Sequence, residues 1–104
     1  MAQYDVYPNP SASVGNGIPY VVVIQSDLLD APSTRLTMPL AALTFAGKVP
    51  SALCTLVMVK GQRVYGPAHF AAPLPAKLLR KPVDNVAAQA SALVAAMDVV
   101  LSGA

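Results

Sequence analysis

The sequence predicts an α+β domain, in which a mainly antiparallel β-sheet forms first and one long helix follows. Two observations predict this class. Residues 4–70 contain short runs that are β-branched or alternate between apolar and polar side chains, with turn-forming residues between them. Residues 85–102 are rich in alanine, lack proline and carry apolar residues at helical spacing. Strands followed by a segregated helix are typical of the α+β class, and 104 residues suit a single domain spanning 1–104.

The first two strands are expected at residues 4–8 and 20–25. The run "YDVYP" ends where Pro8 and Pro10 forbid further backbone donation. The run "YVVVIQ" is continuously apolar and β-branched, which is typical of a strand covered on both faces. Residues 8–18 are expected to form a loop.

The third strand is expected at residues 34–40, "TRLTMPL". Its alternation places Leu36, Met38 and Leu40 on one face. Pro39 indicates an edge or a bulge at that end of the strand. Residues 41–52 are expected to form an irregular connection.

A hairpin is expected next, from residues 54–60 and 63–70. The pair Gly61-Gln62 between them fits a two-residue type II′ turn. Residues 71–82 contain three prolines and are expected to cross the surface, with room for one more short strand.

The last element is predicted to be a helix with Asp84 as its N-cap and Gly103 as its stop. Its apolar residues recur at helical spacing, and the opposite face is almost uncharged. We therefore expect both faces to be covered. The predicted stripe is Val86, Ala90, Leu93, Val94, Met97 and Leu101, and the opposite face is Ala88, Ala92, Ala95 and Val99.

The composition points to a protein that associates. Hydrophobic residues make up 55% of the chain and charged residues 12%, about half of the usual charged share of about 25%. A small domain of this kind exposes an apolar patch, and we expect a homodimer. The net charge of +2 and the scattered basic residues, apart from the pair Arg80-Lys81, argue against direct nucleic-acid binding.

The location is expected to be cytoplasmic. The lone Cys54 forms no internal disulfide, and the first residues lack the features of a signal peptide. The apolar run 86–101 is too short and too interrupted to cross a membrane.

The residues give little support for catalysis. The chain has one histidine, His69, which is expected in a strand, and no glutamate. We expect no metal, no cofactor and no catalytic residue. One enzymatic alternative is a metal-independent ribonuclease with Arg35 on the phosphate, Thr34 or Thr37 as a polar partner and His69 as acid or base. In the simpler alternative, Arg35 pairs with Asp30 across the turn.

The turn after the second strand carries a distinctive pattern. The stretch "VVVIQSDLLDAPSTRLTMPLA", together with the terminal "AMDVVLSGA", resembles the CcdB family of plasmid-encoded and chromosomal toxins. The resemblance spans nearly the whole chain and is strongest over residues 20–41 and 93–104. The matching positions are Gln25, Ser26, Asp27, Leu28, Leu29, Asp30, Pro32, Arg35, Pro39 and Leu40, with Tyr4 to Tyr7 as the family's opening strand.

The resemblance implies a small SH3-like β-barrel with a long C-terminal helix, assembled as a homodimer. It also implies a toxin of a type II toxin–antitoxin pair that traps DNA gyrase on cleaved DNA and is not an enzyme. The implied partners are the A subunit of gyrase and a cognate CcdA-like antitoxin. The residues implied to bind gyrase are Leu28, Leu29, Asp98, Leu101, Ser102, Gly103 and Ala104. An alternative for the two leucines is that one of them plugs the end of the barrel.

One position departs from the family. Where the best-known member has a tryptophan before its last two residues, this chain has Ser102. Loss of a central aromatic anchor costs about 2 kcal/mol or more, roughly thirtyfold in affinity. Three outcomes stay open for gyrase poisoning: weaker action, action on a gyrase of different shape, or loss. The rival functions are a ribonuclease toxin on the same barrel and a degenerate member that only binds antitoxin.

Overall fold

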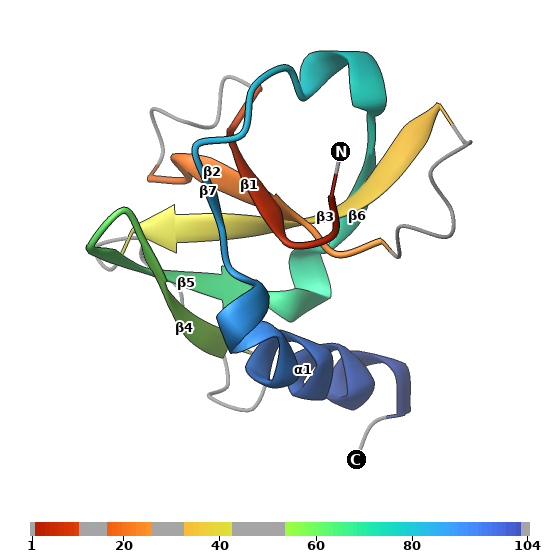
Figure 1. The fold of residues 1–104 in the computed structure, drawn as a ribbon. Coiled ribbons are helices and arrows are strands. Elements are labelled where there is room, and N and C mark those ends of the chain that lie inside the picture. Colours follow the sequence, from red (N-terminus) through yellow and green to blue (C-terminus); the bar gives the residue numbers. More distant parts are fainter. Residues whose placement is uncertain (1, 11–16, 26–32, 43–53, 103–104) are drawn as a thin grey trace.

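The computed structural model describes residues 2–10, 17–25, 33–42 and 54–102 (Figure 1). It confirms the α+β class, with a curled antiparallel sheet of the small SH3-like barrel type and one C-terminal helix. The strands are β1 (Asp5–Pro8), β2 (Tyr20–Val23), β3 (Thr34–Ala42), β4 (Cys54–Val59), β5 (Gln62–Pro67), β6 (Ala72–Pro75) and β7 (Asp84–Asn85). The helical elements are the 3₁₀ turns η4 (Ala68–Phe70), η5 (Ala76–Leu78) and η6 (Ala87–Gln89), and the helix α1 (Ala90–Ser102).

Strand β3 organises the sheet because it pairs along both of its edges. One edge pairs with β2 over residues 37–40. The other edge pairs with β6 over residues 34–37 and with β5 over residues 41–42. Pro39 lies between these last two pairings, so its missing N–H interrupts neither of them. The expectation that Pro39 marks an edge strand is wrong, because β3 is a central strand and Pro39 pairs with Val21 of β2.

Side chains close the barrel where the ladder ends. The strand order runs β4-β5-β3-β2-β1-β7, and the carboxylate of Asp84 in β7 accepts the backbone N–H of Lys60, just after β4, at 2.8 Å. The side chain of Gln89 accepts the N–H of Met58 at 3.0 Å and donates to its carbonyl at 3.3 Å. The segment that leads into α1 therefore covers the outer edge of β4.

The same contacts perturb one carboxyl group. The backbone N–H of Lys60 lowers the pKa of Asp84 below its ordinary value, and the N–H of Asn85 adds to the effect. Hydrogen bonds to the charged form favour that form. The charged carboxylate thus stabilises the closure of the barrel.

The core has two parts, on opposite faces of β1 and β2. The main cluster lies between the curled sheet and α1, and includes Val22, Met38 and Leu40. The smaller cluster contains Tyr7, Val21, Val23 and Leu79. Successive valines of β2 thus face opposite clusters, which confirms the prediction of a strand covered on both sides.

Helix α1 lies beneath the β4–β5 hairpin, and its C-terminal end projects from one end of the molecule (Figure 1). Leu93 and Ala96 point into the main cluster and are 1% and 4% exposed. The hydroxyl of Thr55 on β4 donates to the carbonyl of Ala92 at 3.2 Å. No helix in the described ranges is long and apolar enough to span a membrane.

The predicted start of the helix is wrong. The α-helix begins at Ala90, and Asp84 lies in β7. Its carboxylate accepts the backbone N–H of Lys60, just after β4, and does not cap the helix. The side-chain oxygen of Asn85 accepts the N–H of Ala87, the first residue of η6, at 2.9 Å. Pairing of the 84–85 segment with β1 outweighs its capping propensity.

Two further predictions are wrong because the hairpin turn and the end of β5 lie one to three residues before their expected positions. The hairpin turn uses Lys60 and Gly61, with φ of 51° and 79°, because Val59 pairs with Gln62. Positive φ at both positions is the type I′ arrangement, not type II′. His69 lies in η4 and not in a strand, since β5 ends at Pro67. The additional short strand after residue 71 is confirmed as β6. The predicted irregular connection falls mostly outside the described residues.

Candidate partner-binding surface

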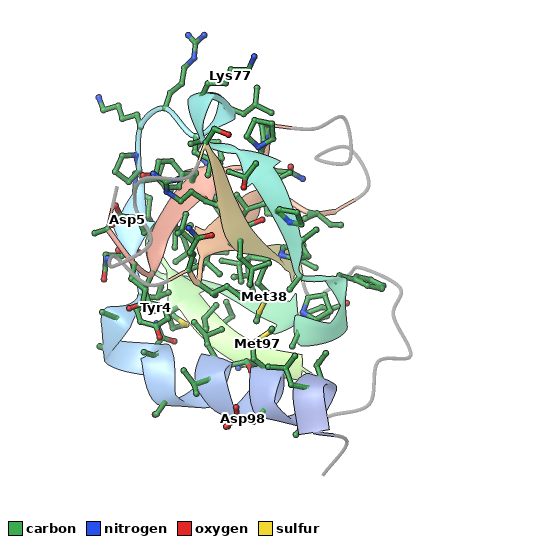
Figure 2. All side chains as sticks on the ribbon, turned by 90° about the vertical axis from the view of Figure 1, so that its right-hand side faces the viewer. Tyr4, Asp5, Met38, Lys77, Met97 and Asp98 are labelled. Carbon is green, nitrogen blue, oxygen red and sulfur yellow. The ribbon has the colours of Figure 1, made fainter. Side chains whose placement is uncertain are left out.

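The outward side of α1 carries apolar side chains that this chain does not bury. Val94 is 47% exposed and Leu101 is 78% exposed, and Asp98 is also exposed. These residues follow one another at spacings of four and three, so they form one stripe along the helix. We call Val94, Asp98 and Leu101 the outer face of α1. In Figure 2, Asp98 points away from the sheet, whereas Met97 points toward Met38.

The outer face is held in place by the inner one. Leu93 and Ala96 anchor the helix in the main core, and Gln89 ties its first turn to β4 through Met58. A helix fixed on one side presents a preformed surface on the other. Such a surface loses less conformational entropy on binding than a mobile segment does.

A pocket of about 190 Å³ opens beside the outer face. Val94 and Met97 form its helical wall, and Ile24 and Leu36 form the opposite wall. The complete lining is Gln3, Tyr4, Ile24, Leu36, Leu93, Val94 and Met97. Ile24 and Leu36 belong to the two chain segments that flank residues 26–32, so these segments approach α1.

Backbone hydrogen bonds fix the walls of this pocket. The N–H of Ile24 donates to the carbonyl of Leu36 at 3.0 Å, and the side chain of Gln3 donates to the carbonyl of Ile24 at 3.1 Å. Tyr4 has a positive φ of 69°, a conformation that costs a non-glycine residue about 1–2 kcal/mol. Its N–H donates to the carbonyl of Val23 and its carbonyl accepts the N–H of Val86, and these bonds hold it there.

The structure places part of the predicted binding set on this surface. Asp98 and Leu101 lie on the outer face, and Ser102 is the last residue of α1. Leu28, Leu29, Gly103 and Ala104 lie outside the described residues. The sequence placed Val94 and Leu101 in one helical stripe with Leu93. Both are exposed, whereas Ala96, outside that stripe, is buried with Leu93. Helical spacing alone does not fix how α1 is rotated about its axis. The burial of Leu93 in the core determines which side of the helix faces inward.

The geometry gives little support for a catalytic groove around Arg35. Arg35 is only 8% exposed, and its guanidinium donates to the carbonyl of Thr34 at 2.9 Å. The hydroxyl of Thr37 is buried and donates to the carbonyl of Ala72 at 3.0 Å. The Thr37 hydroxyl thus links β3 to β6, and the Arg35 guanidinium contacts the backbone of its own strand. The proposed pairing of Arg35 with Asp30, and the His69 side chain, lie outside what the structure describes. Within the described ranges, no group of three potential metal ligands comes together.

Comparison with known proteins identifies the family. The chain matches the family described as CcdB protein over residues 3–103. A search of curated proteins found no match. The match covers essentially the whole chain, and the barrel with its C-terminal helix agrees with it. The chain therefore belongs to the CcdB family, and it is a toxin of the toxin–antitoxin type.

Proposed function

We propose that this protein binds the A subunit of DNA gyrase through the C-terminal end of α1 and traps the gyrase–DNA cleavage complex. It acts by binding and not as an enzyme, and a cognate CcdA-like antitoxin neutralises it. The observation that carries the proposal is the outer face of α1, where Leu101 is 78% exposed at the end of a well-anchored helix. Membership of the CcdB family supports gyrase as the proposed partner.

The proposed gyrase-binding residues come from the C-terminal end of the chain and from the segment that holds Leu28 and Leu29. Asp98, Leu101 and Ser102 belong to α1, and Gly103 and Ala104 follow them in the sequence. Leu28 and Leu29 would extend the surface, which the approach of Ile24 and Leu36 to α1 supports.

The active form is proposed to be a homodimer with the two helices side by side. The exposed Val94 and the small, uncharged residues of the outer side, such as Ala95, allow two helices to approach closely. The low charged share of 12% fits a surface that is covered in the assembly. A dimer would present two copies of the helix end to gyrase together.

The strength of the interaction is limited by the residues available. Burying an exposed leucine contributes about 1.5–3 kcal/mol, and Ser102 adds little apolar area. Leu101 is therefore the main apolar anchor that this helix end offers. Its truncation should weaken binding roughly tenfold to a hundredfold.

The test uses gyrase, supercoiled plasmid and ATP with purified protein, followed by denaturation and measurement of linear DNA. Wild-type protein should produce linear DNA, and deletion of residues 102–104 or Leu101→Ser should abolish or strongly reduce it. Ala88→Ser, an equally polar change at an exposed position of η6, should leave it unchanged. A Leu101→Ser protein as potent as wild type would contradict the assigned surface. No linear DNA with wild type would favour a member that only binds antitoxin, and RNA cleavage would favour the ribonuclease alternative.

A further inference from the structure

A positively charged surface lies at the end of the molecule opposite to α1. Lys77 of η5 projects there, whereas Asp98 projects from the other end (Figure 2). Arg80 and Lys81 follow Lys77 within four residues, and all three are exposed. The exposed Leu78, at 45%, stands among them. We call Lys77, Leu78, Arg80 and Lys81 the basic cap.

The charge of the cap differs from that of the remaining chain. Of the seven basic residues, three are in the cap. The other four are outnumbered by five acidic residues. Two of the three acidic groups that the structure describes accept hydrogen bonds from other groups: Asp84 accepts the backbone N–H of Lys60, and Asp5 accepts the side-chain amide of Asn85. The third, Asp98, lies at the opposite end of the molecule from Lys77 (Figure 2). The cap is thus a local positive field on a nearly neutral molecule.

The backbone of the cap is anchored firmly. Leu79, next to the exposed Leu78, is buried in the second core cluster at 4% exposure. The N–H of Ala76 donates to the carbonyl of Ser33 at 2.8 Å, and the N–H of Leu79 donates to that of Ala76 at 3.0 Å. The exposure of Leu78 is therefore a consequence of the fold and not of a loose segment.

Two hollows flank the cap, and both combine apolar walls with a cation. One, of about 260 Å³, is lined by Pro8, Asn9, Pro10, Leu78, Arg80 and Lys81. The other, of about 470 Å³, is lined by Ser33, Thr34, Pro75, Ala76 and Lys77. Proline and leucine walls suit apolar side chains, and the cations beside them suit carboxylates.

We propose that the basic cap binds an extended acidic peptide segment of a partner protein, with apolar side chains in the hollows and carboxylates against Lys77, Arg80 and Lys81. A nucleic acid fits less well. Three cations neutralise few phosphates, and the exposed Leu78 and the proline walls offer no contact that a phosphate backbone uses. The proposal does not depend on gyrase binding, because the cap and the outer face of α1 lie at opposite ends.

The experiment measures fluorescence anisotropy of a labelled peptide in which glutamates alternate with leucines, added to the full chain. Two matched peptides replace the glutamates by glutamine or the leucines by serine, and a single-stranded DNA of equal charge is the third comparison. Wild-type protein should bind the glutamate–leucine peptide most tightly, and added salt should weaken the binding.

The variants locate the site. Each exposed ion pair contributes about a factor of two to five, so the triple variant K77S/R80S/K81S should raise Kd roughly tenfold to a hundredfold. Leu78→Ser should raise it by about fivefold. Arg63→Ser, which removes an exposed cation on β5, should leave it unchanged. Circular dichroism checks that each variant is folded.

Three results would overturn the proposal. The first is equal binding by the triple variant and wild type. The second is binding of DNA or of the serine-substituted peptide as tightly as the glutamate–leucine peptide, which would make the cap a simple anion surface. The third is no binding by wild type at concentrations up to about 1 mM.

Discussion

Two substitutions at neighbouring positions, Leu93→Ala and Val94→Ala, test which side of α1 faces the core. We call this orientation of the helix about its axis its register. Leu93 is 1% exposed in the main core, whereas Val94 is 47% exposed on the outer face. Truncating a fully buried leucine costs about 2–5 kcal/mol, depending on how far the neighbouring side chains can fill the space. Leu93 already borders a pocket, so we expect its neighbours to fill the new space only in part. We expect a loss of about 3 kcal/mol, a large part of the roughly 5–15 kcal/mol that stabilises a small domain.

The expected loss at Val94 is much smaller. The substitution removes two carbon atoms that are about half exposed, which costs about 0.8 kcal/mol. Alanine has the higher helix propensity, and this offsets roughly half of the cost. A net loss below about 0.5 kcal/mol is expected for the monomer.

The assay is urea unfolding followed by circular dichroism, over a dilution series of each protein. Dilution separates a contact within the chain from a contact with a second copy, since only the latter depends on protein concentration. A loss at Val94 that fades on dilution is a dimer contact and is compatible with the register. A loss at Val94 that persists and equals the loss at Leu93 would refute the register, and with it the outer face.

Three further predictions concern the barrel. Gly66→Ala should cost about 1–3 kcal/mol in urea unfolding, because the new Cβ would lie 2.7 Å from the sulfur of the buried Met38; a stability equal to wild type would show that Met38 moves aside freely. Gly61→Ala should cost about 1 kcal/mol through its φ of +79° alone, since nothing lies within 4 Å of the added carbon, and a Tm at or above that of wild type would contradict this. Asp84 has a lowered pKa, so its carboxylate stabilises the fold at pH values above its ordinary pKa, and this stabilisation is lost as the pH falls through the lower folded value. The stability difference between wild type and Asp84→Asn should therefore shrink in acid, and a difference that grows in acid would contradict the Lys60 contact.

Much of the sheet could be predicted from residue patterns. The alternation over β3 placed Met38 and Leu40 correctly in the main cluster, whereas Leu36 is only partly buried. The unbroken valines of β2 correctly indicated two covered faces. Local patterns of this kind are reliable because the side chains of a strand point alternately to its two faces.

The error at the start of the helix arises because a side chain serves a distant partner. Asp84 has the sequence context of a helix cap, but Lys60 lies 24 positions earlier and uses its carboxylate. The short strand β7 likewise forms by pairing with β1, which is distant in the sequence, so its own residues do not predict it. No local propensity reports such long-range contacts.

The candidate surface was predicted in part. Leu101 and Asp98 were assigned to gyrase binding by resemblance, and the structure places both on the outside of α1. Val94 was expected to face the core, because the same apolar pattern on a helix is found whether the residues face a core or a partner. The basic cap had only the pair Arg80-Lys81 as its signal, and the fold adds Lys77 and Leu78 to it.

Gyrase poisoning by the C-terminal end of α1 is tested by the cleavage assay with wild-type protein and with the protein lacking residues 102–104. Linear DNA should accumulate with increasing wild-type protein and should not form with the truncated protein, while both proteins have the same circular dichroism spectrum. Equal amounts of linear DNA with both proteins, or none with wild type at any concentration, would contradict this expectation.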